Sequence, residues 1–229
     1  MKGRRLEQLL GEDLAGDALI QEALTHRSAA RRHNERLEFL GDAVLELVVS
    51  ELLYRRFPEA DEGDLSRLRS HLVRKETLAG LAWALELGER VRLGPGERKS
   101  GGHRRDTILA DALEALIGAV YLRRGFEGAR DFVLALWAPR LADLPEAQAL
   151  KDPKTRLQEL LQSRHLPLPE YELLEVRGAE HERSFHVRCQ VPAHALEASA
   201  WGSSRKRAEQ ACAAALLARM AGPMAANHE

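Results

Sequence analysis

The sequence is poor in cysteine and in aromatic residues. Its 229 residues include 2 cysteines, Cys189 and Cys212, which are too few for a disulfide framework and lack metal-ligand spacing. We expect two ordinary thiols in a reducing compartment, although the sequence alone leaves a single disulfide open. Aromatic residues make up 5% of the chain, which is low for a β-sandwich or barrel built on aromatic strands.

The chain also lacks an excess of charge of one sign and a candidate membrane span. Lys and Arg number 34 against 35 Asp and Glu, so the formal net charge of −1 argues against a uniformly basic nucleic-acid coat and leaves room for local basic patches. No stretch approaches the ~20 uninterrupted apolar residues of a membrane-spanning helix. The basic N-terminus acquires acidic residues before any apolar run of signal-peptide length. We therefore expect a soluble, cytoplasmic protein.

Apolar residues make up 45% of the chain, and their spacing predicts helices over its first part. From Leu6 to about Trp137 they recur at steps of three and four, within residues 18–24, 37–53, 65–72, 77–87 and 108–122. Turns that contain Gly and Pro separate these segments. The glycine-rich segment Gly94–Gly102 lacks the spacing of a nucleotide-binding loop and is interpreted as a turn. The pattern predicts an all-α domain over residues 1–142.

The pattern changes in the last third of the chain. Helical periodicity lapses over residues 143–151, which we interpret as a linker. Residues 152–222 then read as one helix, three strands and a long Ala-rich helix, with strands expected at residues 171–177, 184–190 and 196–201. The order α-β-β-β-α predicts a small α+β domain in which both helices cover one face of an antiparallel sheet. A tail of residues 223–229 follows.

Two strongly apolar helical segments carry carboxylates at helical spacing. Glu35, Glu38 and Asp42 are three and four residues apart, so they share one face of the first segment. Asp111 and Glu114 share one face of the second. Repulsion between clustered carboxylates raises their pKa unless a cation neutralises them, and oxygen-only ligands suit Mg²⁺ or Mn²⁺ better than zinc. The spacing gives a candidate divalent-metal site, with two solvated acidic helix faces as the alternative.

A basic cluster lies at the start of the last predicted helix. Arg205, Lys206 and Arg207 fall in its first turn, the end of a helix where the macrodipole disfavours cations. This placement suits a helix N-terminus that holds phosphates together with basic side chains, and a solvated cluster without function is the alternative. Gln158 on the first helix of the domain and His181 between two strands are unremarkable by themselves.

These motifs resemble the bacterial ribonuclease III family, and the resemblance covers nearly the whole chain. NERLEFLGD, residues 34–42, is similar to the defining motif of the family, and similar segments follow in family order at residues 61–70, 93–102 and 108–120. KDPKTRLQELLQ and GSSRKRAEQA are similar to the two ends of its double-stranded RNA-binding domain. The resemblance implies a multidomain chain: an all-α ribonuclease III endonuclease domain followed by an α+β double-stranded RNA-binding domain.

The resemblance also implies a homodimeric endonuclease that cuts double-stranded RNA with Mg²⁺, for which Mn²⁺ can substitute, and leaves 5′-phosphate and 3′-hydroxyl ends. By position, Asp42 and Glu114 match the catalytic pair of the family. The metal-binding carboxylates are implied to be Glu38, Asp42, Asp111 and Glu114. Glu35 and Glu62 match acidic positions that line the same valley between subunits, in a role that the resemblance leaves open. Phe39 matches an aromatic residue that packs into the partner subunit.

In the second domain the resemblance implies contacts to A-form RNA. The first helix, with Gln158, and the turn that contains His181 would contact successive minor grooves, while Arg205 and Lys206 span the phosphates between them. The implied role is processing of ribosomal RNA precursors and other structured RNAs. A non-cleaving double-stranded RNA-binding regulator is the alternative, but a pure binder has no need for clustered carboxylates near a polyanion.

Overall fold

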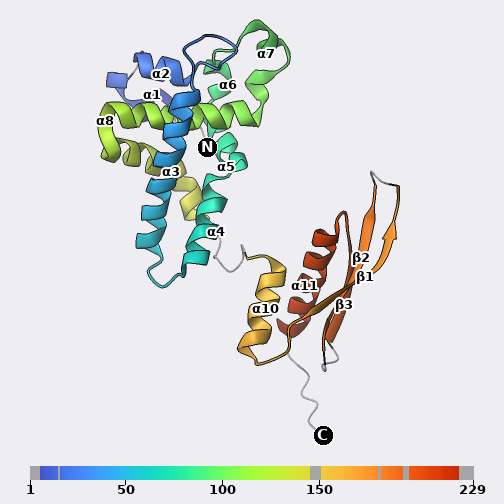
Figure 1. The fold of residues 1–229 in the computed structure, drawn as a ribbon. Helices are drawn as coiled ribbons and strands as arrows, with labels where there is room; N and C mark the ends of the chain where they lie inside the picture. Colours follow the sequence, from blue (N-terminus) through green and yellow to red (C-terminus); the bar gives the residue numbers. More distant parts are fainter. Residues whose placement is uncertain (1–5, 15, 145–150, 180–181, 193–195, 222–229) are drawn as a thin grey trace. The chain divides into compact units, whose positions relative to one another are not determined.

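The computed structural model describes residues 6–14, 16–144, 151–179, 182–192 and 196–221, which fall into two compact units, Met1–Ala147 and Gln148–Glu229 (Figure 1). Most of the predicted linker and all of the predicted tail of residues 223–229 lie outside the described residues, so the expected domain limits stay predictions. Within the described ranges, no helix is both long enough and apolar enough to span a bilayer.

The first unit is built from helices, as the spacing of apolar residues predicts. Its α-helices are α1 (Leu6–Leu10), α2 (Ala18–Ala23), α3 (Glu35–Arg56), α4 (Glu62–Val73), α5 (Lys75–Ala84), α6 (Leu87–Arg90), α7 (Pro95–Lys99) and α8 (Asp106–Ala142). α8 consists of two helical segments joined at Gly125, where a φ of 69° interrupts the helix. The prediction of an all-α first domain is confirmed.

One local prediction is wrong. The glycine-rich segment Gly94–Gly102 is not a plain turn, because α7 occupies Pro95–Lys99 within it. Proline at the first helical position has a φ suited to the helix and no N–H left without a partner. The helix ends before Gly101, whose φ of 80° lies in the left-handed region that glycine adopts readily. Five residues are too few for helical periodicity to show in the sequence.

The backbones of α3 and α8 touch where the two helices cross (Figure 1). A Cβ atom on Gly41 of α3 would lie 1.7 Å from the carbonyl oxygen of Glu114, and one on Gly118 of α8 would lie 2.3 Å from the carbonyl oxygen of Leu37. Only glycine fits at both positions, because the neighbouring atom is backbone and cannot rotate aside. The close approach brings Glu38, one turn before Gly41, next to α8.

The second unit has the order that the sequence predicts. It consists of α10 (Pro153–Ser163), β1 (Glu170–Arg177), β2 (Ser184–Val191), β3 (Leu196–Gly202) and α11 (Arg205–Ala221). The strands form an antiparallel sheet in the order β1-β2-β3, and each extends one residue beyond its predicted range. α10 and α11 lie side by side, with α11 against β2 and β3. The predicted α+β fold is confirmed.

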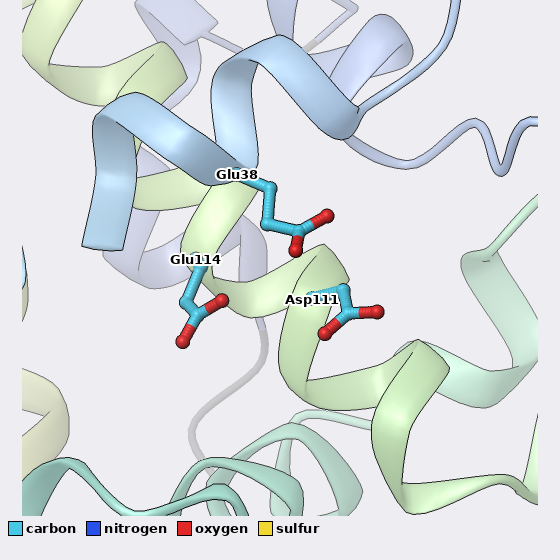
Figure 2. A group of neighbouring side chains, drawn as sticks. All are labelled: Glu38, Asp111 and Glu114. Atoms are coloured by element: carbon cyan, nitrogen blue, oxygen red, sulfur yellow. The ribbon is translucent and has the colours of Figure 1, made fainter.

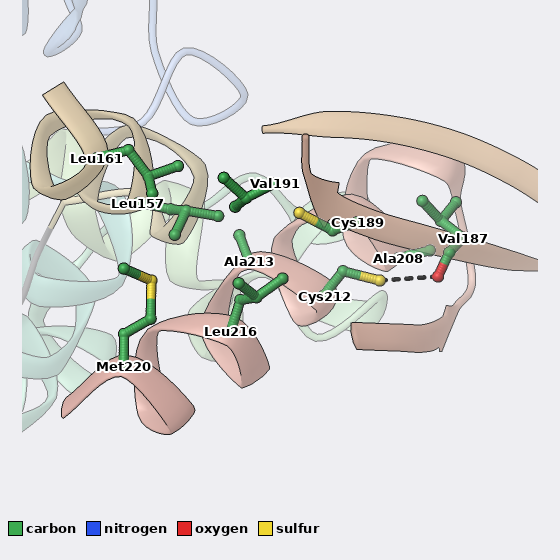
Figure 3. Packing of buried hydrophobic residues seen from close by; sticks show 10 residues of the cluster. All are labelled: Leu157, Leu161, Val187, Cys189, Val191, Ala208, Cys212, Ala213, Leu216 and Met220. Carbon is green, nitrogen blue, oxygen red and sulfur yellow. Dashed lines mark hydrogen bonds between the residues drawn. The ribbon is translucent and has the colours of Figure 1, made fainter. Parts of the chain in front are cut away.

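The second unit has an apolar core of its own between helices and sheet. It includes Leu157 and Leu161 of α10, alternate residues of β2 and the inner face of α11 (Figure 3). Cys189 and Cys212 lie in this core as free thiols, so they do not form the single disulfide that the sequence alone left open. The Cys212 thiol donates a hydrogen bond of 2.8 Å to the carbonyl oxygen of Val187.

Candidate functional site

Three carboxylates from two helices meet beside the crossing of α3 and α8. One oxygen each of Glu38, Asp111 and Glu114 lies within 4.8 Å of the other two (Figure 2). Glu38 comes from the first turn of α3, and the i, i+3 spacing places Asp111 and Glu114 on one face of α8. Glu114 is 8% exposed and the other two are half-buried. Hard divalent cations take such oxygen donors, so these residues fit a Mg²⁺ or Mn²⁺ ion.

The three carboxylates line a cavity of about 920 Å³ with more acids than bases. Its lining contains six carboxylates and three cationic side chains. Each cation pairs with one acid: Arg27 with Glu35 at 3.2 Å, Lys75 with Asp111 at 3.7 Å, and Arg105 with Glu97 at 2.7 Å. Within the described ranges, no ion pair involves Glu38, Asp42 or Glu114. The cavity therefore holds unneutralised negative charge, which a bound cation would balance.

Burial raises the pKa of all three clustered carboxyls, and the negative charge of neighbouring carboxylates adds to this effect. Burial, and next the negative charge of Asp42, raise the pKa of Glu114 to about 7. Burial also raises the pKa of Glu38, with a further contribution from Asp111. For Asp111, burial raises the pKa more than the nearby Lys75 ammonium lowers it. Near neutral pH and without a cation, Glu114 is therefore partly protonated.

We expect the free energy of unfolding, measured in chelator, to fall as the pH rises from about 4.5 to about 7. The folded protein holds the Glu114 proton over this window while the unfolded chain has lost it, so protons favour the folded state. This contribution to the free energy of unfolding is fully present below the pKa of Glu114 in the unfolded chain and is lost as the pH rises through its pKa in the folded protein. The raised pKa of Glu114 corresponds to a fall of about 3 kcal/mol in the free energy of unfolding across this window.

Urea unfolding at several pH values in this window measures the effect. Glu114→Gln is the matched variant, since its amide cannot titrate and the variant should lack this part of the pH dependence. Saturating Mg²⁺ should restore most of the stability lost at pH about 7, because a bound cation takes the place of the proton. An identical pH dependence in the wild-type protein and the variant would contradict the prediction.

The other acids implied by the resemblance lie at different distances from this group. Asp42 is one helical turn after Glu38 and lines the same cavity, but its side chain is exposed and it is not one of the three clustered carboxylates. Glu35 also lines the cavity. Glu62 begins α4 and lines a separate hollow of about 660 Å³ together with Tyr54. Within one chain, Glu62 thus does not join the cavity.

Lys75 also belongs to this site, although the sequence did not predict it. It occupies the first position of α5, and its Nζ lies 3.7 Å from Oδ1 of Asp111. Its positive charge partly offsets the larger effect of burial on the pKa of Glu38 and of Glu114. A single lysine at a helix start has no spacing relation to the acidic segments, so no sequence signal points to it.

Three of the four predicted RNA-binding side chains lie on the two helices of the second unit. Arg205 and Lys206 occupy the first two positions of α11 and are exposed. Gln158 is exposed on α10. His181 lies outside the described residues. The structure thus places three of the four predicted residues at the protein surface.

Phe39, the predicted dimer contact, is 82% exposed although it is apolar. It lies on α3 directly after Glu38. Two further large side chains of α3 are exposed, Leu47 at 56% and Tyr54 at 74%. Exposed apolar side chains grouped on one helix are typical of a surface that another protein covers.

Comparison with known proteins identifies relatives over both units. A family model described as Ribonuclease-III-like matches residues 16–141, and one described as Double-stranded RNA binding motif matches residues 153–220. Ribonuclease 3 of Proteus mirabilis (strain HI4320) is 50% identical over 216 residues, which cover 94% of this chain and 96% of that protein. Two structures of the nuclease domain of ribonuclease III from Campylobacter jejuni are 45% identical, with TM-scores of 0.56 and 0.54. The matches cover 60% and 59% of this chain, and 96% and 92% of those chains.

Proposed function

The chain belongs to the ribonuclease III family of double-stranded RNA endonucleases, and from that premise we propose that it hydrolyses its substrate with Mg²⁺ and leaves 5′-phosphate and 3′-hydroxyl ends. The observation that carries this proposal is the meeting of Glu38, Asp111 and Glu114 in a cavity with unneutralised negative charge. Mn²⁺ suits the same oxygen donors and can substitute.

We assign two overlapping roles to the four carboxylates of this site. Asp42 and Glu114 are the catalytic pair, and the metal-binding set is Glu38, Asp42, Asp111 and Glu114. When bound, the cation lowers the pKa of water and stabilises negative charge on phosphate oxygens. The chain holds the carboxylates in place through the contact of α3 with α8, and Lys75 adds a positive charge beside Asp111.

The second unit supplies affinity for the duplex in this proposal. The exposed Gln158, Arg205 and Lys206, together with His181, contact the grooves and phosphates of A-form RNA. Contacts of this kind recognise shape more than base sequence, so the length and interruptions of the duplex decide which RNAs are cut. Precursors of ribosomal RNA and other structured RNAs, processed in the cytoplasm, are the natural substrates that we propose.

We propose that a second copy of the chain covers the exposed apolar side chains of α3. Phe39, Leu47 and Tyr54 would otherwise stay in water, which is unfavourable for large apolar groups. One of the two Campylobacter jejuni structures is described as showing structural flexibility in a region of that nuclease domain involved in dimer formation. A homodimer has two carboxylate sites and can cut both strands of one duplex.

Cleavage of a long, fully paired RNA by the purified full-length protein tests the proposed function. We expect cutting in Mg²⁺ and in Mn²⁺, binding without cutting in Ca²⁺ and no cutting in chelator. The products should carry 5′-phosphates and short 3′ overhangs. A DNA duplex of the same sequence is the control and should stay intact, because 2′-hydroxyls and A-form geometry distinguish RNA from DNA.

Two outcomes would contradict the proposal in different ways. Tight binding of RNA in every condition without cutting in any would favour a non-cleaving RNA-binding regulator. Equal cutting in Mg²⁺ and in chelator would show that the carboxylates are not a metal site.

A further inference from the structure

Glu209 of α11 lies between two cationic side chains of the second unit. Its Oε2 accepts a hydrogen bond of 2.6 Å from the Lys154 ammonium of α10, and its Oε1 accepts one of 2.9 Å from Nε of Arg205, one turn earlier on α11. The carboxylate is largely buried, with 13% of the side chain exposed. Each oxygen thus holds a different cation.

Both cations are held in one orientation by this arrangement. Arg205 uses its Nε for Glu209, its two terminal NH₂ groups have no partner among the described residues, and 60% of the side chain is exposed. An arginine anchored through Nε presents the outer edge of its guanidinium to a phosphate. The Lys154 ammonium also lies 4.4 Å from the centroid of the Tyr171 ring, which fixes it from a second side.

A second pair of residues joins the same two helices. Oδ1 of Asp152 accepts a hydrogen bond of 2.9 Å from the backbone N–H of Lys154 and so caps α10. Oδ2 of Asp152 accepts a hydrogen bond from the amide of Gln210, the residue after Glu209. Adjacent residues of α11 therefore hold the first turn of α10 at two points.

The charge of Glu209 is unfavourable for an RNA-binding surface taken alone. Burial raises its pKa, but the hydrogen bonds from Lys154 and Arg205 outweigh burial and lower it, so the carboxylate is ionised at neutral pH. A negative charge one turn from Arg205 weakens the attraction of phosphates to that region. Removing this negative charge should tighten RNA binding unless Glu209 also supports binding in another way.

We propose that Glu209 is a positioning residue for RNA binding: it orients Arg205 and joins α10 to α11, so that Gln158, Arg205 and Lys206 meet the duplex at one fixed spacing. The inference rests on the proposed function, since it takes these three side chains as RNA contacts. A-form RNA is a stiff helix with a set distance between its minor-groove and phosphate contacts, so the two helices must match it.

Glu209→Gln and Glu197→Gln, compared in the full-length protein, test the proposal. Both remove one negative charge from the same unit, but Glu197 is exposed on β3 and belongs to neither helix. Affinity for an RNA duplex is measured in Ca²⁺ at several salt concentrations, and KM and kcat are measured in Mg²⁺. We expect Glu209→Gln to weaken binding about tenfold and raise KM with kcat unchanged, while Glu197→Gln binds as tightly as the wild-type protein or slightly more tightly.

Two further variants separate positioning from folding. Glu209→Asp keeps the charge but shortens the side chain, so it should weaken binding although no charge is lost. Arg205→Ala should weaken binding and lower the slope of log affinity against log salt by about 0.9, one phosphate contact. In the Arg205→Ala background Glu209→Gln should have a smaller effect than alone, which a general loss of folding would not produce.

The possible failures are distinguishable. Binding by Glu209→Gln that equals or exceeds that of Glu197→Gln would overturn the positioning role and leave the proposed function intact. Unchanged binding by Arg205→Ala would instead remove Arg205 from the proposed RNA contacts, and the inference about Glu209 with it.

Discussion

Replacement of Glu114 by glutamine is expected to slow the cleavage of duplex RNA about a thousandfold while RNA binding stays the same. Glu114 belongs to the carboxylate cluster, within 4.8 Å of Glu38 and Asp111, and it is the most buried of the three. Glutamine has nearly the same shape but carries no charge. A loss of about 4 kcal/mol of transition-state stabilisation is the size expected when a metal ion is no longer held.

The same substitution should make folding more favourable in chelator at neutral pH. Glutamine avoids the cost of burying a negative charge at this position and the repulsion by neighbouring carboxylates, which together raise the pKa of Glu114. Activity and stability therefore change in opposite directions, which separates loss of a metal site from loss of structure. Single-turnover cleavage and urea unfolding of one preparation measure both.

Asp131→Asn is the matched control for this substitution. Asp131 is exposed on α8 beyond Gly125, so its replacement removes the same charge from the same helix outside the cavity. We expect wild-type cleavage from this variant. Cleavage by Glu114→Gln at the control rate would show that Glu114 is not part of the catalytic site.

Gly41→Ala is expected to destabilise the first unit by about 3 kcal/mol or more, because the added methyl overlaps the carbonyl oxygen of Glu114. The atom in the way belongs to the backbone of α8, so the two helices must move apart to admit the methyl group. That movement separates Glu38 from Glu114, and the metal affinity of the folded fraction should fall as well.

Thermal unfolding of the full-length protein measures the loss, which we expect to be about 10 °C in the transition of the first unit. Gly96→Ala is the control, because a Cβ atom there meets nothing within 4 Å. Alanine is the better helix former, so that variant should melt at or slightly above the wild-type temperature. Equal melting temperatures for the two variants would mean that the close contact of α3 and α8 is not required.

Elements that repeat one pattern several times could be predicted from the sequence. The alternation along β2 and the three- and four-residue steps of α3 and α8 each extend over many residues, so a single exception does not hide them. The i, i+3 spacing of Asp111 and Glu114 predicted their common face for the same reason. What the spacing could not decide was whether that face is solvated, and the structure buries Glu114 there.

Features that depend on one residue, or on contacts between distant segments, could not be predicted in this way. Lys75 reaches Asp111 only because α5 packs against α8. The need for glycine at position 41 comes from the carbonyl group of a residue more than seventy positions away. α7 has too few residues to show a period. In each case the deciding atom lies outside the window that a sequence pattern covers.

The placement of the two thiols leaves the first unit without any group that a thiol reagent can modify. Both cysteines of the chain lie in the core of the second unit, and the first unit contains none. Burial raises the pKa of Cys212 to about 11 and also raises that of Cys189, so neither offers a reactive thiolate while the core is closed. An alkylating reagent should therefore modify Cys189 and Cys212 only when the RNA-binding unit opens. Unfolding of the nuclease unit exposes no thiol, so the rate of alkylation measures the opening of the RNA-binding unit alone.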